Sequence, residues 1–316
     1  MRPCARRGAV LLMGPTGAGK SELAVRLAAE FPFEIISTDS ALVYRGMDIG
    51  TAKPDLATRR GVPHHLIDIC DPTQTYSAGD FLVDAAAVME EIWQRGRLPL
   101  FVGGTMLYFH TLSEGIAVLP DRDPAVRAGI DAEAALLGWP HMHRELEKVD
   151  PAAAARIHAN DPQRIQRALE VYRLTGQPIS MLQQMRTSVL AGAHVIELAL
   201  APSDRNILHG RLEARFDAML AAGLVAEVRR LWERGDLTAE HPSMRAVGYR
   251  QMWRHLDAGC PLREAREEAI AATRQLAKRQ LTWLRARKRA AWFDAVHPDV
   301  AALLRDALAR GGMSRW

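Results

Sequence analysis

A glycine-rich segment near the start of the chain limits the possible folds more than any other feature. It reads Gly14-Pro15-Thr16-Gly17-Ala18-Gly19-Lys20-Ser21 and lies between an apolar run at residues 10–13 and an apolar-periodic stretch that begins at Glu22. A loop of this kind between a strand and a helix is typical of phosphate-binding loops, because successive backbone N–H groups and the helix dipole point at one anion. We predict that the loop binds a polyphosphate. A glycine-rich turn that only matches the pattern is the alternative.

The last two residues of this loop add a charge and a metal ligand. Lys20 can neutralise phosphate oxygens, and the Ser21 hydroxyl can ligate Mg²⁺. The sequence therefore predicts Mg²⁺ as the cofactor, with Ser21 as its protein ligand.

Strand and helix signals alternate along the chain, which is typical of a parallel sheet. Strands are expected at residues 10–13, 34–37, 65–69, 98–103, 194–200 and 292–294, and helices at 21–30, 79–95, 203–222, 225–233 and 262–287. Residues 121–189 carry mainly helix signals, including two Asp-Pro pairs that can cap helices. We predict an α/β fold with a P-loop NTPase-like core at residues 1–120 and 190–316, and an inserted all-helical domain at 121–189. The last twenty or so residues carry no signal that we could interpret.

An aspartate follows the second expected strand. Asp39 comes directly after residues 34–38, so it should lie at the carboxyl edge of the sheet, where such folds bind ligands. There it could act as a general base or as an outer-shell partner of a metal. A helix cap or turn is the alternative role for an aspartate at this position.

The composition is that of an ordinary globular protein, with 48% hydrophobic and 25% charged residues. Its apolar runs are far shorter than the roughly 18 residues of a membrane span, and no signal peptide is apparent, so we expect a cytoplasmic protein. The three cysteines have no spacing typical of zinc sites or disulfides. Four tryptophans on expected helices have apolar neighbours and are predicted to belong to the core: Trp93, Trp232, Trp253 and Trp283.

A stretch of the chain between residues 268 and 294 lacks acidic residues. On a helix, Arg274, Lys278, Arg285 and Arg289 would form a basic face beside an apolar stripe. Such a face could contact phosphates of a nucleic acid, or it could be an ordinary solvated surface.

Five motifs, in order, resemble the tRNA dimethylallyltransferase family, the tRNA isopentenyltransferases that prenylate an adenosine. They are the phosphate-binding loop, residues 39–42 with their continuation at 46–54, residues 102–108, residues 161–170, and residues 242–253. The resemblance implies transfer of a dimethylallyl group from dimethylallyl diphosphate to the N6 amine of the adenosine that follows the anticodon, in tRNAs that read codons beginning with U. It implies tRNA as the partner. No membrane association is expected from the apolar runs, no obligate protein partner is apparent, and a monomer is compatible with the sequence.

The resemblance also implies roles for individual residues. Asp39 and Thr105 would be catalytic, and Arg215 would hold the diphosphate together with residues 14–21. Contacts with tRNA would come from Asp39, Ser40, Ala41, Leu42, Thr105, Arg127, Gln163, Arg164, Ile165, Gln166, Arg167, Arg245, Ala246, Val247, Gly248, Tyr249 and Arg250. Tyr249 could stack on an unpaired base. From the residues alone, a solvated surface charge is the more common role of such an arginine, and only the resemblance favours contact with tRNA.

Two other classes of protein use the same kind of loop. A small-molecule kinase would transfer the terminal phosphoryl group of ATP, and an NTP-dependent RNA-binding protein would hydrolyse a nucleotide. Hydrolysing proteins usually end a second strand with a carboxylate that holds Mg²⁺, but here the strand at 98–103 leads into Gly104 and Thr105. This absence counts against hydrolysis, although Asp39 could take that role.

Overall fold

The structure is a computed structural model that describes residues 7–117, 119–184 and 187–313. The chain forms two compact units. Unit 1 consists of Met1–Ser113 and Val189–Trp316, and unit 2 of Glu114–Ser188. A helical unit is thus inserted into a larger one.

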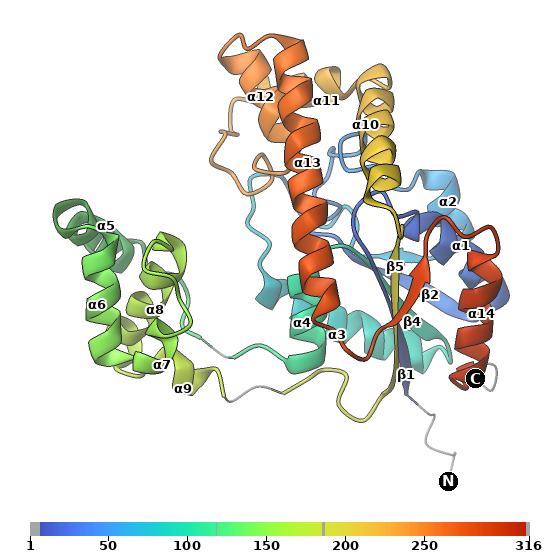
Figure 1. Cartoon of the computed structure of the whole chain (residues 1–316), viewed down its shortest axis with the longest axis horizontal. Helices are drawn as coiled ribbons and strands as arrows, with labels where there is room; N and C mark the ends of the chain where they lie inside the picture. The colour runs from blue at the N-terminus through green and yellow to red at the C-terminus, as the bar shows by residue number, and fades with distance from the viewer. Residues whose placement is uncertain (1–6, 118, 185–186, 314–316) are drawn as a thin grey trace. The chain divides into compact units, whose positions relative to one another are not determined.

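Unit 1 is built on a six-stranded sheet in which every pairing is parallel (Figure 1). The order across the sheet is β3-β2-β4-β1-β5-β6. The strands are β1 (Gly8–Met13), β2 (Phe33–Thr38), β3 (His64–His65), β4 (Leu98–Gly103), β5 (His194–Ala201) and β6 (Ala291–Asp294). The last residues of β1 and β2 both pair with Gly103, so the loops after β1, β2 and β4 begin side by side.

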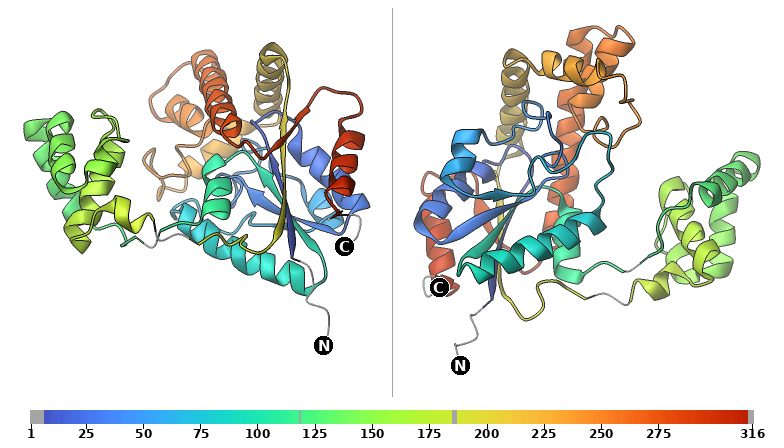
Figure 2. Two further views of the ribbon diagram at one scale, coloured as in Figure 1. Left: turned by 60° about the horizontal axis from the view of Figure 1, so that its bottom comes forward. Right: turned by 180° about the vertical axis from the view of Figure 1, so that it is seen from behind.

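Helices cover both faces of this sheet (Figure 2). Alternate residues of β1 belong to different cores: Leu11 packs with α3 and α4, whereas Leu12 packs with α1 and α14. A strand buried on both faces is continuously apolar, as the run at residues 10–13 is. The helices of unit 1 are α1 (Lys20–Glu30), α2 (Leu56–Gly61), α3 (Ala78–Gln94), α4 (Met106–Glu114), α10 (Arg205–Ala221), α11 (Leu224–Trp232), α12 (Tyr249–Asp257), α13 (Leu262–Arg285) and α14 (Val300–Arg310).

Unit 2 is helical and has its own apolar core, which includes Ile130, Met142, Leu146 and Ile165. Its helices are α5 (Pro124–Leu137), α6 (Trp139–Val149), α7 (Pro151–Ala154), α8 (Pro162–Thr175) and α9 (Ile179–Leu182). Both Asp-Pro pairs cap helices, as predicted. The Asp150 carboxylate accepts a hydrogen bond from the backbone N–H of Ala153, and that of Asp161 accepts one from Arg164.

The predicted strand at residues 65–69 is wrong for most of its length. Only His64–His65 pairs with β2, because the chain then turns: Leu66 and Asp68 have φ angles of 60° and 59°. The turn lets the Asp68 carboxylate form ion pairs with Lys53 and Arg59. The alternation of residues within the predicted strand could not show these ion pairs, because Lys53 and Arg59 lie outside it.

The last segment forms a helix that the sequence analysis did not identify. On α14, Val300, Leu304 and Leu308 lie four residues apart and pack into the core on the α1 face of the sheet. In the described ranges, no helix is long and apolar enough to cross a membrane.

We predict that α14 stabilises the core, and that the effect depends on which face of the helix is altered. Leu304 is fully buried, whereas its neighbour Leu303 is 38% exposed. Leu304→Ala should destabilise the protein by about 2–4 kcal/mol through lost burial and an unfilled cavity, and Leu303→Ala by less than about 1 kcal/mol. Thermal and urea unfolding of both variants measures the difference. Equal losses would show that α14 contributes helix propensity and not core packing.

Candidate active site

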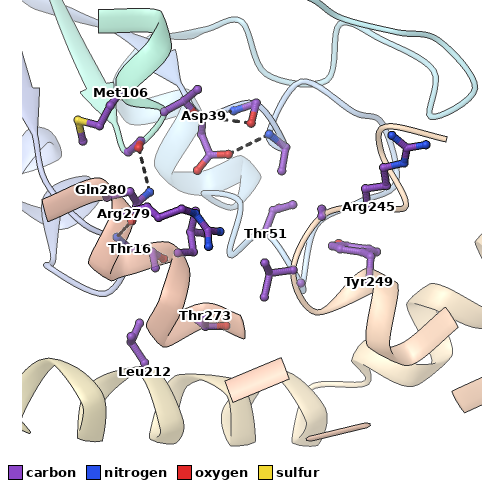
Figure 3. A pocket seen from close by; sticks show the side chains of 18 of the residues that line it. Thr16, Asp39, Thr51, Met106, Leu212, Arg245, Tyr249, Thr273, Arg279 and Gln280 are labelled. Atoms are coloured by element: carbon purple, nitrogen blue, oxygen red, sulfur yellow. Dashed lines mark hydrogen bonds between the residues drawn. The ribbon is translucent and has the colours of Figure 1, made fainter. Parts of the chain in front are cut away.

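The loops that follow β1, β2 and β4 open into one pocket of about 510 Å³ in unit 1 (Figure 3). Its walls come from six parts of the chain. Three are loops, namely the phosphate-binding loop and the loops after β2 and β4, and the others are α10, the segment that precedes α12, and α13. The lining includes Thr16, Asp39, Ser40, Ala41, Thr51, Thr105, Arg215, Arg245, Ala246, Val247, Tyr249, Arg279, Gln280 and Trp283.

The glycine-rich segment has the conformation that an anion-binding loop needs. Gly17 and Gly19 have φ angles of 79° and 82°, and α1 begins at Lys20. A Cβ atom on Gly14 would lie 2.2 Å from the carbonyl oxygen of Leu200 on β5, so only glycine fits there. The helix amino end and the turned backbone therefore converge at the base of the loop.

The Lys20 ammonium is buried inside this loop. It donates a hydrogen bond of 2.7 Å to the carbonyl oxygen of Pro15. Burial lowers the pKa of Lys20 to about 8, the negative charge of Asp39 opposes this shift, and the positive charge of Arg215 adds to it. The lysine is thus a weakly solvated cation that an anion in the loop would stabilise.

Arg215, on α10, connects the loop with the segment after β2. Its guanidinium donates hydrogen bonds to Thr16 Oγ1 at 3.2 Å and to the carbonyl oxygen of Thr51 at 3.4 Å. Burial lowers the pKa of Arg215, and the charge of Asp39 opposes that shift. Two partly desolvated cations, Lys20 and Arg215, therefore lie near one carboxylate.

Asp39 follows β2 at the edge of the pocket, as predicted. Its Oδ1 accepts a hydrogen bond of 2.9 Å from the backbone N–H of Ala41, so it has the turn-forming contact that was the alternative role. Thr105 lies opposite: its hydroxyl oxygen accepts a bond of 3.1 Å from the backbone N–H of Ser40, and its own N–H bonds to the carbonyl oxygen of Thr38. These bonds fix the Asp39 loop against the end of β4.

Gln280 is a site residue that sequence reasoning missed. On α13, its Oε1 accepts a hydrogen bond of 2.9 Å from the backbone N–H of Thr16, and its Nε2 donates one of 2.9 Å to the carbonyl oxygen of Gly104. The side chain therefore joins the phosphate-binding loop to the loop that carries Thr105. A polar residue between the apolar positions Ala277 and Leu281 was the available signal.

Ser21, the predicted Mg²⁺ ligand, is exposed on the first turn of α1. It lines a second hollow together with Glu22, Ala52, Pro54 and Thr58. The described residues contain no cluster of three or more His, Cys, Asp or Glu side chains that could hold a metal. A single hydroxyl still suits Mg²⁺, since this ion commonly keeps several waters and binds through substrate phosphates.

The residues of unit 1 that were predicted to contact tRNA differ in accessibility. Ser40, Arg245 and Arg250 are exposed, and Ala41 and Leu42 are half-buried, as are Ala246 and Val247. Gly248 is buried, and Tyr249 has no exposed surface. Stacking of the Tyr249 ring on a base is therefore not supported by this conformation.

In unit 2, a buried carboxylate engages two of the predicted tRNA-binding arginines. Arg127 and Arg167 donate hydrogen bonds of 2.7–3.1 Å to Glu170, which has no exposed surface. Burial raises the pKa of Glu170, but the bonds from the arginines outweigh it and hold the value at about 2. The bonds from Arg127 join α5 to α8 within unit 2, and both arginines keep only their remaining N–H groups for a ligand.

The other predicted residues on α8 lie on different faces of the helix. Ile165 belongs to the core of unit 2, and Gln166 donates a hydrogen bond to Asp131. Gln163 and Arg164 are exposed. Among the predicted residues on α8, only these two are exposed.

The basic face of α13 is partly neutralised by a neighbouring helix. Arg274 forms an ion pair of 2.9 Å with Glu213 on α10, whereas Lys278 and Arg285 are exposed. The predicted place of Arg289 on this face is wrong, because α13 ends at Arg285 and Arg289 lies beyond it. The predicted core position of Trp283 is wrong, since this side chain is 44% exposed and lines the pocket. Trp232 is likewise 38% exposed, whereas Trp253 is 5% exposed and belongs to the core.

Together, the phosphate-binding loop at the end of a central parallel strand and the pocket beside it define a P-loop α/β protein with an inserted helical unit. The family model described as IPP transferase matches residues 42–287, so the chain belongs to that family.

Close relatives and solved structures agree with this membership. The chain is 55% identical over 310 residues to a tRNA dimethylallyltransferase of Ralstonia nicotianae, covering 95% of this chain and 96% of the relative. A relative of the same name from Nitrosococcus oceani is 57% identical over 295 residues, covering 93% and 94%. The full-length tRNA isopentenylpyrophosphate transferase of Bacillus halodurans is 37% identical with a TM-score of 0.69, covering 98% and 99%. A eukaryotic dimethylallyltransferase solved acting on tRNA is 28% identical with a TM-score of 0.82, covering 98% of this chain and 80% of that one.

The environment of Lys20 predicts how anion binding depends on pH. Since the empty site loses the Lys20 charge above about pH 8, the affinity for inorganic pyrophosphate should fall by up to about tenfold per pH unit above that value. Lys20→Arg should bind with a flatter profile, because arginine stays charged. Calorimetry from pH 7 to 9.5 measures both curves. Because pyrophosphate itself loses a proton in this range, the readout is the ratio of the two affinities. A ratio that stays constant from pH 7 to 9.5 would contradict the charged-lysine account.

Proposed function

We propose that this protein transfers the dimethylallyl group of dimethylallyl diphosphate to the N6 amine of the adenosine that follows the anticodon, in tRNAs that read codons beginning with U. The observation that carries the proposal is one pocket lined by both a phosphate-binding loop and an aspartate. The names of the relatives, which span almost the whole chain, support the same reaction.

The diphosphate of the donor would occupy the phosphate-binding loop. The backbone N–H groups of the loop, Lys20 and Arg215 would stabilise the negative charge that grows on the diphosphate as its carbon–oxygen bond breaks. Their partial burial strengthens this effect, because it removes competing water. Mg²⁺, bound by Ser21 and the phosphates, would neutralise further charge on the leaving group.

Asp39 would act on the acceptor. The N6 amine of adenine is a poor nucleophile because its lone pair is delocalised into the ring. As the new N–C bond forms, the Asp39 carboxylate would accept the departing proton, and pyrophosphate would leave from the other side of the reacting carbon. Thr105, whose hydroxyl is fixed against Ser40, would help to hold the reacting groups in line.

The adenine must leave the stack of the anticodon loop to reach Asp39. The pocket walls formed by Arg245, Ala246 and Val247 would surround the extruded base and its backbone. The exposed cations Lys278 and Arg285 on α13, together with Gln163 and Arg164 on unit 2, would contact tRNA phosphates. The chain would carry out this reaction in the cytoplasm without an obligate protein partner.

A small-molecule kinase is the weaker alternative. It shares the phosphate-binding loop, but the strand that ends beside the loop leads to Gly104 and Thr105, without a carboxylate to hold nucleotide-bound Mg²⁺. Incubation of the protein with labelled dimethylallyl diphosphate, Mg²⁺ and unmodified tRNA, followed by nucleoside analysis, decides between them. We expect N6-isopentenyladenosine. Formation of ADP from ATP without a prenylated nucleoside would refute the proposal.

The proposed role of Asp39 predicts a selective kinetic defect. Asp39→Asn keeps the size and one acceptor oxygen but cannot take up the proton, so single-turnover prenylation should fall by about 10²- to 10⁴-fold. Donor and tRNA should bind within a few-fold of wild type. The control is Asp299→Asn, an exposed aspartate before α14 whose side chain makes no capping bond. Lost tRNA affinity with an intact saturated rate would mean that Asp39 only positions the base.

The proposed tRNA contacts of α13 predict a change in salt dependence. Lys278→Ala combined with Arg285→Ala should lower the slope of log affinity for tRNA against log salt by about one unit per lost phosphate contact. Affinity for the donor should hardly change. Arg263→Ala serves as the control, since its side chain is 90% exposed at the other end of the same helix. An unchanged slope in the folded double variant would make this face an ordinary solvated surface.

A further inference from the structure

Glu227 is a buried carboxylate that belongs to none of the motifs identified in the sequence. It lies on α11, is 1% exposed and does not line the pocket. Its Oε2 accepts hydrogen bonds from the backbone N–H groups of Asp48 at 3.0 Å and Ile49 at 2.8 Å. Its Oε1 accepts bonds from the N–H of Gly50 at 3.1 Å and from the Tyr249 hydroxyl at 2.5 Å.

These four bonds match the acceptor capacity of a carboxylate, which offers about four lone-pair sites. Three successive N–H groups that point at one anion form a nest, and here the protein fills that nest with its own side chain. All four donors are neutral, so no cation takes part in these bonds. No neutral side chain of similar size can accept four bonds, and a substitution would leave buried N–H groups without acceptors.

The residue that follows this nest supports the diphosphate side of the pocket. The carbonyl oxygen of Thr51 accepts a hydrogen bond from Arg215, which also reaches Thr16 of the phosphate-binding loop. The Thr51 hydroxyl in turn bonds to the carbonyl oxygen of Met47 at 2.7 Å. The position of the Arg215 guanidinium therefore depends on where the segment from residue 48 to 51 is held.

The other partner of Glu227 supports the opposite wall. The Tyr249 ring packs against Gly50 so closely that a Cβ atom there would lie 2.5 Å from Tyr249 Cε2. Tyr249 begins α12, two residues after Val247, and both Ala246 and Val247 line the pocket. Figure 3 shows Thr51 and Tyr249 among the residues that line the pocket. One carboxylate thus fixes two segments that are distant in sequence.

We propose that Glu227 is a positioning residue that sets the place of Arg215 for the diphosphate through the nest at residues 48–50. Through Tyr249 it also fixes the wall against which the acceptor base would lie. The identity of the donor rests on the function proposed above, but the effect of Glu227 on diphosphate binding does not.

Substitution of Glu227 tests this inference with inorganic pyrophosphate as the probe. Glu227→Gln should weaken pyrophosphate binding by about tenfold in calorimetry, because it loosens the segment that holds Arg215. Glu233→Gln is the matched control, since it alters the same residue type at the exposed end of α11. Tyr249→Phe removes one of the four bonds and keeps the ring, so it should weaken binding by about 2- to 4-fold and remain folded.

A double-mutant cycle distinguishes positioning through Arg215 from a general loss of stability. In an Arg215→Ala background, Glu227→Gln should change pyrophosphate affinity by less than about twofold, whereas in a Lys20→Ala background it should keep its full effect. If Glu227→Gln does not fold, the same cycle is run with Tyr249→Phe. An equal loss in both backgrounds, or an unchanged affinity in folded Glu227→Gln, would overturn the inference.

The experiments on Glu227 and the test of the transferase reaction have separate readouts. A wild-type protein that binds pyrophosphate but forms no prenylated nucleoside would refute the transferase reaction, and the cycle would still report on Glu227.

Discussion

The arrangement of this site depends on the pairing of β2, β4 and β1 as neighbouring parallel strands. Since β1 and β2 end opposite the same residue, Gly103, the three loops that follow begin at a common edge. That pairing brings together the phosphate-binding loop, Asp39 and Thr105, although β1 ends at Met13, β2 at Thr38 and β4 only at Gly103. The chemistry of the site follows from the topology, because ligands of such folds bind at the carboxyl edge of the sheet.

Burial of charge is the second constraint on the site. Lys20 and Arg215 are held where burial disfavours their charges, and the Asp39 carboxylate only partly offsets that cost. A bound diphosphate would supply the missing negative charge, which explains why an enzyme would keep such an arrangement. Gln280, a neutral side chain, joins two of the loops without adding charge to the pocket.

Local sequence patterns predicted those parts of the structure that local interactions determine. The glycine-rich loop, the capped helices α7 and α8 and the helix α13 were all predictable from spacing and capping residues. Even α14 had a readable signal in Val300, Leu304 and Leu308. The role of Glu227 and the engagement of Arg127 with Glu170 were not predictable, because each depends on pairing across more than forty residues. For the same reason, the ion pair of Arg274 with Glu213 was not predictable. The exposure of Trp283 depends on how the pocket walls assemble, which apolar neighbours along the helix do not show.

The central claim is that the phosphate-binding loop holds the diphosphate of the prenyl donor beside Asp39. A crystal structure with an unreactive sulfur-bridged analogue of dimethylallyl diphosphate tests it most directly. We expect the diphosphate oxygens within hydrogen-bonding distance of the backbone N–H groups of residues 17–21 and of Arg215, with the allylic carbon facing the pocket that Asp39 lines. A diphosphate bound outside the loop, or an allylic carbon directed away from Asp39, would contradict the account.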